Sequence, residues 1–336
     1  MKVAVFGCGL IASRWVRTLA DDPRITIGAL ADPDTEAAER LARRYQLTVP
    51  RLTGWQQALE IAGLDAVVNL TPPARHACVS AAALDAGLHV LTEKPLAISL
   101  REATELVHQA RAVGRHLLVM QNRAMDPRFL AFRDVVRASP GPWAVTADTL
   151  VTLHRPGFRT RMRRPVLTDL AVHAFDQIRQ LIPAAALDIQ AAEVPLPHQG
   201  AHCALATLLL RFTDGSVFSY RGGYTSGGLH TPASGRWGAV GKDLASTWDG
   251  EDQLTHGAIG EPSANLEPLP EAPAGYQLVI EAMVDVLHGG SSLELAAEQN
   301  LGSIALLDAA LRSAALARPC PVDLPDPLQE ALDAAP

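Results

Sequence analysis

The stretch Val3-Ala4-Val5-Phe6-Gly7-Cys8-Gly9-Leu10-Ile11-Ala12 decides the fold of this chain. A short apolar run ends at Phe6, and a glycine-rich turn leads from it into a segment with helical spacing of apolar residues. In this G-x-G-x-x-A pattern, Gly7 permits the tight turn and Gly9 lets the backbone approach a pyrophosphate. Ala12 lets the helix pack close to the sheet, and the N-terminus of that helix faces the anion. The pattern predicts a dinucleotide-binding unit at the start of the chain.

A carboxylate at the end of the second predicted strand supports this interpretation. Asp32 lies about 20 residues beyond the glycines, where an adenosine ribose would donate its hydroxyl groups. Pro33 and Asp34 follow it, so the phosphate of NADP would meet negative charge without a compensating cation, which is costly. We therefore expect NAD rather than NADP. The alternative is purely structural: a turn glycine pair followed by an aspartate that caps a helix.

Short apolar runs alternate with helical segments through residues 1–121. The strands are expected at Val3–Phe6, Ile25–Ala31, Ala66–Leu70, His89–Thr92 and His116–Met120, and the helices at Ile11–Ala20, Thr35–Tyr45, Trp55–Ile61, Arg75–Ala86 and Leu100–Val113. Strands that alternate with such helices are joined by crossovers in a mostly parallel sheet. The sequence therefore predicts a doubly wound Rossmann domain over residues 1–121.

Longer, antiparallel-looking strands follow over residues 122–336, which we expect to form a second domain. The predicted strands are Trp143–Leu153, His202–Phe212, Ser216–Tyr224 and Arg236–Trp248, and the predicted helices are Pro127–Ala138, Val166–Leu181, Tyr276–His288 and Leu295–Leu316. The turn Thr213-Asp214-Gly215 indicates a hairpin. Asp249–Gly275 is expected to be a surface loop and Pro319–Pro336 to be loosely packed. A sheet with helices on one face is the simplest architecture, and the terminal helices can pack back on the first domain.

Composition excludes several classes of protein. The 336 residues are 48% hydrophobic and 19% charged, unlike disordered, collagen-like or disulfide-scaffold chains. The net charge of −7 argues against a nucleic-acid partner, and no apolar run reaches the roughly 18 residues that span a bilayer. The four cysteines form no C-x-x-C pair, so we expect neither a metal site nor a disulfide framework. With no targeting pattern at the N-terminus, a cytoplasmic location is expected.

The carboxyl ends of two neighbouring strands carry polar loops, and ligands of parallel sheets bind at this edge. One loop is Thr71-Pro72-Pro73, with His76 shortly after it, and the other is Glu93-Lys94-Pro95. Lys94 is one of only three lysines in a chain that otherwise uses arginine. From its position alone, a catalytic role for Lys94 and an ordinary role as a surface charge are equally favoured.

These motifs, with Asp169-x-x-x-His173-x-x-Asp176, resemble the Gfo/Idh/MocA oxidoreductases over essentially the whole chain. The resemblance implies a nucleotide-binding domain followed by an α+β domain with a large open, mostly antiparallel sheet. It also implies homodimers or homotetramers assembled through that sheet, and NAD(P)-dependent redox chemistry on sugars, cyclitols or related polyols. The implied cofactor contacts are Gly7, Gly9, Leu10, Ile11, Ala12, Asp32, Thr71, Pro72, His76, Glu93 and Lys94, and the implied catalytic residues are Lys94, Asp169 and His173.

Oxidation of a secondary alcohol needs a base for the hydroxyl proton while a hydride leaves the carbon. On one helix, Asp169, His173 and Asp176 would share a face, and a histidine has a pKa suited to this proton transfer. We expect His173 to be the base, Asp169 to orient the substrate or the imidazole, and Lys94 to stabilise the charge on the oxygen. A buried histidine capped by a local carboxylate is the structural alternative.

The chain departs from the family pattern around the proposed acid. Ala171 stands where the family usually has glycine, and no Gly-Gly precedes Asp169, which suggests an atypical substrate. Five arginines occur within 155–164, a run typical of a solvated or subunit-contact surface. Arg159 and Arg161 would also suit a carboxylate or phosphate on an acidic sugar derivative. Arg123 is a further candidate for substrate contact, although a structural ion pair is equally favoured.

The leading interpretation is an NAD-dependent dehydrogenase of a sugar, cyclitol or sugar-acid-like compound. Two alternatives stay open at this point. One is an enzyme that keeps its nicotinamide cofactor between turnovers and works in a closed cycle. The other is a non-catalytic NAD-binding sensor or repressor, against which the presence of Lys94, Asp169 and His173 argues.

Overall fold

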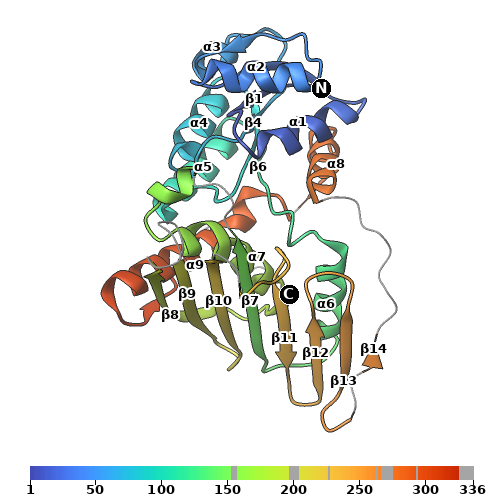
Figure 1. Cartoon of the computed structure of the whole chain (residues 1–336), viewed down its shortest axis with the longest axis vertical. Coiled ribbons are helices and arrows are strands. Elements are labelled where there is room, and N and C mark those ends of the chain that lie inside the picture. The colour runs from blue at the N-terminus through green and yellow to red at the C-terminus, as the bar shows by residue number, and fades with distance from the viewer. Residues whose placement is uncertain are drawn as a thin grey trace. The chain divides into compact units, whose positions relative to one another are not determined.

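The computed structural model describes residues 1–152, 157–196, 204–225, 228–261, 264–265, 275–292 and 294–324. Within these ranges the chain divides into two compact units (Figure 1). The first contains residues 1–122 and 275–304, and the second contains 123–265 and 305–324. The long helix α9, Ala297–Leu316, contributes its residues up to Ile304 to the first unit and the later ones to the second.

The first unit contains a six-stranded sheet in the order β3-β2-β1-β4-β5-β6, and all its neighbouring strands run parallel. Its strands are β1 Lys2–Phe6, β2 Thr26–Ala31, β3 Arg51–Leu52, β4 Ala66–Asn69, β5 His89–Thr92 and β6 Leu117–Val119. Its helices are α1 Ala12–Asp21, α2 Thr35–Arg44, α3 Trp55–Leu59, α4 Pro73–Asp85, α5 Leu100–Ala112, α8 Gly275–Leu287 and the start of α9. The doubly wound Rossmann fold is therefore confirmed.

Local sequence explains the helix starts in this unit. The Asp34 side chain accepts hydrogen bonds from the backbone N–H groups of Glu36 and Ala37 and so caps α2. Ser99 caps α5 in the same way, through the backbone N–H of Glu102. The strand β1 is buried along almost its whole length, as expected for a central strand with helices on both faces.

The second unit contains a nine-stranded sheet in the order β14-β13-β12-β11-β7-β10-β9-β8-β15, in which only β7 and β10 pair in parallel (Figure 1). Its strands are β7 Ala144–Thr152, β8 Ala186–Pro195, β9 Ala204–Phe212, β10 Val217–Thr225, β11 Arg236–Val240, β12 Leu244–Trp248, β13 Leu254–Ala258, β14 Ala264–Asn265 and β15 Cys320–Pro321. The predicted mostly antiparallel sheet and its hairpin at Thr213-Asp214-Gly215 are confirmed.

Helices cover one face of this sheet. Phe129 and Phe132 of α6 (Pro127–Arg137) and Phe175 of α7 (Val172–Leu181) pack with the inward side chains of the strands in one apolar core. On the other face the side chains alternate outward, and Leu209 of β9 and Val240 of β11 are exposed. The sheet is thus open on the side away from the helices.

Several expectations for the second half were wrong. The predicted single strand Arg236–Trp248 is a hairpin, because the chain turns between Val240 and Leu244 and the backbone N–H of Gly241 donates to the Leu244 carbonyl oxygen. The expected loop Asp249–Gly275 contains β13, which pairs with β12, and β14, which pairs with β13. Backbone pairing rather than a strong apolar pattern holds both strands. The strand β8 was not anticipated either.

Two further corrections concern chain segments that pack more tightly than expected. The segment from Pro319 was expected to be loose, yet Cys320 is buried and pairs with Ile189 of β8. The predicted helix Val166–Leu181 begins with a π-helical turn, Val166–Ala171, before α7. Leu153, Arg155, His202, Cys203 and residues 325–336 lie outside the described residues.

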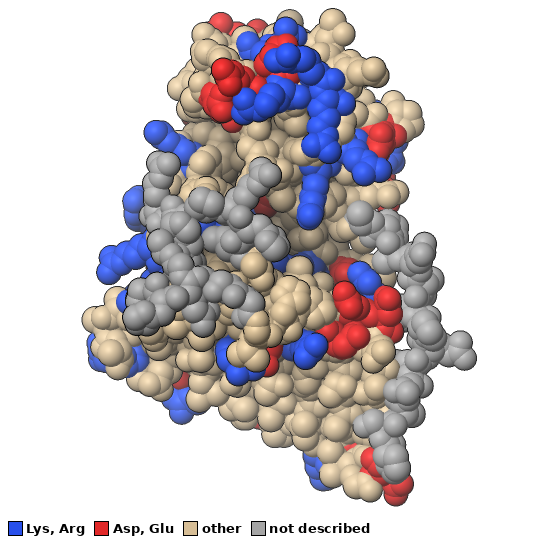
Figure 2. Space-filling view, in the orientation of Figure 1, with Lys and Arg blue, Asp and Glu red and all other residues tan. Residues whose placement is uncertain are grey.

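Among the helices that the structure describes, none has the length and apolar character needed to cross a bilayer. Acidic and basic side chains are intermixed on the visible face of each unit (Figure 2). This mixture accords with a moderate net charge of −7.

Candidate cofactor and active site

The two glycines of the turn after β1 have different surroundings. Gly7 has a φ of +94°, and a Cβ there would lie 2.6 Å from the Leu70 carbonyl oxygen, so this turn requires glycine. At Gly9 no described atom lies within 4 Å of where a Cβ would stand. The turn is therefore closed on the side of the sheet and open at Gly9.

The first turn of α1 can receive an anion. Within the described chain, no side chain caps its N-terminus at Ile11, and the first turn contains no acidic residue. Leu10 beside it is 64% exposed, while Ala12 is fully buried, as the predicted close packing of helix and sheet requires. The positive end of a helix dipole without a side-chain cap, beside the open space at Gly9, fits a pyrophosphate.

Asp32 lies next to this turn because β2 runs alongside β1. One of its carboxylate oxygens accepts the backbone N–H of Cys8, and the other accepts that of Asp34, both at 2.7 Å. Burial, and then the charges of Asp32 and Asp34, raise the pKa of the Cys8 thiol to about 12, which keeps this cysteine protonated. The ribose-binding role of Asp32 stays a prediction, and its geometry fits that role.

The loops after β4 and β5 are tied together by His76. One ring nitrogen lies 2.6 Å from the Pro95 carbonyl oxygen and the other 2.7 Å from the Thr71 carbonyl oxygen. Both partners are acceptors, so both nitrogens must carry a proton for the two bonds to form together. Asn69 holds the start of the same loop, because its Oδ1 accepts the N–H and the hydroxyl of Thr71. Pro72, the N-cap residue of α4, is exposed.

Glu93 and Lys94 follow β5 directly. The Glu93 side chain is buried, and its backbone N–H donates to the Asn69 carbonyl oxygen at 2.9 Å. Lys94 is half-buried. The structure therefore brings the glycine turn, the loop after β4 and the Glu93-Lys94-Pro95 segment to one edge of one sheet, as the sequence predicted.

In the second unit, Asp169 is held by two side chains. Its Oδ2 accepts the Nε–H of Arg159 at 2.5 Å and also the phenol of Tyr224, which reaches it from β10. Burial, and then the charge of Asp169, raise the pKa of Tyr224 well above its usual range, so the phenol stays a donor. Burial alone would lower the pKa of Arg159, but the Asp169 carboxylate raises it above its ordinary value.

The helix that carries the proposed base does not have simple α-helical spacing. Asp169 lies in the π-helical turn, whereas His173 and Asp176 lie in α7. The expected i, i+4, i+7 spacing on one α-helical face therefore does not hold for Asp169. All three side chains are buried. Asp176 pairs with Arg179 at 3.9 Å.

Glu193 of β8 supports the start of this helix. Its carboxylate accepts the backbone N–H groups of Val166 and Leu167 at 3.3 and 3.0 Å, and burial raises its pKa. Neither this contact nor that of Tyr224 followed from the sequence. The sequence places Tyr224, an aromatic residue with a hydroxyl group, on a predicted strand. That position suits a core residue as well as a site residue, so it did not identify the contact with Asp169.

The arginine-rich segment is only partly described. Arg155 and the side chain of Arg161 lie outside the described residues, and Arg159 is engaged with Asp169. Arg123 opens the second unit, and its charge acts on the buried Tyr220 phenol. The contacts of Arg123, Arg159 and Arg161 with a substrate stay predictions, as does the meeting of Lys94 with His173, which belong to different units. Among the described residues, no three His, Cys, Asp or Glu side chains gather as a metal ion would require.

Comparison with known proteins agrees with this geometry. Residues 1–121 match the model of the Gfo/Idh/MocA family, described as oxidoreductases with an NAD-binding Rossmann fold. These matches support a Gfo/Idh/MocA family oxidoreductase, with the NAD-binding Rossmann fold in residues 1–121. Inositol 2-dehydrogenase 4 of Saccharopolyspora erythraea is 31% identical over 54% of each chain, and the inositol 2-dehydrogenase of Rhizobium meliloti is 23% identical over 94% of this chain and 97% of its own.

A solved structure shows the same fold over both halves of the chain. An oxidoreductase from Agrobacterium radiobacter, solved with NAD⁺, L-tartaric acid and magnesium, superposes with a TM-score of 0.82 at 19% identity. The match covers 96% of this chain and 98% of that one. The fold that the two proteins share therefore extends beyond the segment that the family model matches.

Proposed function

We propose that this family member is an NAD-dependent dehydrogenase that interconverts a secondary alcohol and a ketone of a sugar, cyclitol or sugar acid. The turn that is open at Gly9, beside the carboxylate of Asp32, carries the proposal. The relatives named inositol 2-dehydrogenases support the substrate class. The positive N-terminus of α1 supports the binding of a pyrophosphate.

The residues of the chain divide the chemistry between them. When bound, NAD⁺ would supply the acceptor for the hydride of the carbinol carbon. His173 takes the hydroxyl proton as the C–O bond becomes a carbonyl, and it returns that proton in the reductive direction. Lys94 donates a hydrogen bond to the same oxygen and stabilises its developing negative charge. Asp169, which accepts hydrogen bonds from Arg159 and Tyr224, orients the imidazole or the substrate.

The charges around Asp32 support NAD over NADP. Asp34 and Glu36 add two carboxylates near it, and Arg40 lies at 3.3 and 3.2 Å from these two rather than on Asp32. Arg40 thus compensates Asp34 and Glu36, and the charge that a 2′-phosphate would meet is that of the Asp32 carboxylate, which repels it.

The open face of the nine-stranded sheet supports assembly of two or four copies. Outward apolar side chains such as Leu209 and Val240 stand on the strands of this sheet. Exposed apolar side chains on an open sheet face suit a subunit contact, and we propose that a second copy of this chain covers this face.

The appearance of NADH during incubation with a panel of cyclitols, sugars and sugar acids tests the proposal, with NADP⁺ in parallel. His173→Asn and Lys94→Met should each lower kcat by about 10² to 10⁴-fold, the usual contribution of an acid–base group. Lys242→Met, at an exposed turn, is the matched control and should keep full activity. A protein that binds NAD⁺ yet oxidises nothing on the panel would contradict the proposal and favour a sensor.

A further inference from the structure

The indole of Trp15 connects two segments of the first unit. Trp15 lies in α1, three residues after Ala12, and is fully buried. Its Nε1–H donates to Oε1 of Glu93 at 2.8 Å. The other oxygen of that carboxylate accepts the backbone N–H of Lys94 at 3.2 Å. One buried carboxylate thus links the helix after the glycine turn to the backbone of Lys94.

The surroundings keep this link rigid. The ring of Tyr276, on α8, meets the Trp15 indole edge to face, with centroids 5.3 Å apart and planes at 88°. Glu93 itself is only 8% exposed, so its bonds are formed away from bulk water. Hydrogen bonds to a charged group are stronger than neutral ones, and a buried carboxylate loses more when a donor is removed.

We propose that Trp15 is a positioning residue for the cofactor site. Its N–H holds the Glu93 carboxylate, and through it Lys94, at a fixed place relative to α1. This inference rests on the proposed function, because α1 is the helix that would receive the pyrophosphate. The glycine turn would then bind the adenosine and pyrophosphate, and the Glu93-Lys94-Pro95 segment would contact the nicotinamide half. The hydrogen bond from Trp15 to Glu93 connects these two binding segments.

Trp15→Phe is the decisive variant, since it keeps an aromatic ring against Tyr276 and removes the N–H donor. Calorimetric titration with NAD⁺ and with ADP, which has only the adenosine and pyrophosphate, separates the two halves. The variant should bind NAD⁺ about tenfold more weakly, the loss expected for one hydrogen bond to a charged group, and should bind ADP as the wild type does.

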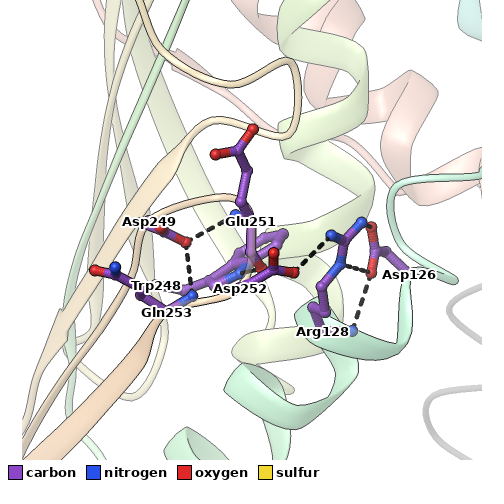
Figure 3. Close-up of polar contacts among 7 residues, drawn as sticks. All are labelled: Asp126, Arg128, Trp248, Asp249, Glu251, Asp252 and Gln253. Carbon is purple, nitrogen blue, oxygen red and sulfur yellow. Dashed lines mark hydrogen bonds and ion pairs between the residues drawn. The ribbon is translucent and has the colours of Figure 1, made fainter. Parts of the chain in front are cut away.

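A double-mutant cycle with Glu93→Leu tests whether Trp15 acts through the carboxylate. In the Glu93→Leu background, where the acceptor of the indole N–H is gone, Trp15→Phe should change the Kd for NAD⁺ by less than about threefold. Trp248→Phe is the matched control. That buried indole also donates one hydrogen bond, to the Glu251 carbonyl oxygen at 2.9 Å, but in the second unit (Figure 3). It should leave both ligand affinities unchanged.

The outcomes separate this inference from the proposed function. Equal weakening of NAD⁺ and ADP binding by Trp15→Phe, or additive losses in the cycle, would show that Trp15 only supports the packing of α1 and would overturn the inference. Such a result would leave the dehydrogenase proposal intact. Failure of the wild-type protein to bind either NAD⁺ or ADP would instead refute the proposed function.

Discussion

The two units hold their central carboxylates in opposite ways. In the first unit, Asp32 accepts two backbone N–H groups, from Cys8 and Asp34. In the second unit, Asp169 accepts the side chains of Arg159 and Tyr224. The backbone conformation of a turn positions its N–H donors whatever its side chains are. Side-chain donors are available only where tertiary packing brings particular residues together. The first centre is therefore a property of a local motif, and the second is a property of the packed unit.

The largest effect is expected where side chains alone provide the bonds. Asp169→Asn leaves the Arg159 guanidinium, 29% exposed, without its carboxylate, and should lower the free energy of unfolding by about 3 kcal/mol. Urea denaturation of the purified protein measures this change. Asp188→Asn is the control, because its ion pair with Arg211 is at the surface and its loss should have no measurable effect. Equal losses in both variants would remove the distinction between the two centres.

A smaller effect is expected in the first unit, and it should divide between two glycines. Gly7→Ala forces an unfavourable positive φ and a contact with the Leu70 carbonyl, so it should cost about 1–3 kcal/mol of stability. Gly9→Ala meets open space and should keep the melting temperature, while weakening NAD⁺ binding by about tenfold, comparable to the loss of one hydrogen bond. Thermal melts and calorimetry on both variants check this. A loss of stability in Gly9→Ala would mean that the turn is not open there.

The smallest effect concerns His89, which begins β5 at the opposite end from Glu93. Burial, and then the charges of His116 and Arg115, lower the pKa of His89 to about 4, and its Nδ1 accepts the backbone N–H of His116 at 3.0 Å. Between pH 6.5 and 4 the unfolded chain binds a proton that the folded protein does not, so stability falls as the pH falls through this range. His89 is partly solvated, which limits the effect to about 1 kcal/mol. His89→Gln should flatten the pH dependence of the melting temperature there, and an unchanged dependence would exclude this role.

The first unit was predictable from sequence almost throughout, because its elements are marked locally. The strand β1 and the helix α2 follow from an apolar run and from the Asp34 cap, and each predicted boundary falls within a residue or two of the observed one. Only the two-residue strand β3 was missed. The Gly7 turn and Asp32 lie at spacings that a single motif determines, so their meeting at one edge of the sheet was also anticipated.

The second unit was less predictable, for two physical reasons. Strands β8 and β13 have weak apolar alternation and are stabilised by pairing with β9 and β12, so their own residues carry little signal. The π-helical turn containing Asp169 was predicted as part of an ordinary α-helix, because its apolar residues fit the spacing of either kind of helix. The partners of Asp169 are 10 and 55 residues away along the chain, and no spacing rule connects them.

The sequence by itself determined the parallel nucleotide-binding sheet, the glycine turn and the residue types available for acid–base chemistry. It did so because short-range sterics, apolar periodicity and helix capping act over a few neighbouring residues. Only the tertiary structure decided that Arg159 and Tyr224 hold Asp169, that Glu193 supports the start of its helix, and that Trp15 holds Glu93. Each of these bonds joins residues brought together by the burial of apolar side chains elsewhere, and burial depends on the packing of the whole unit rather than on adjacent residues.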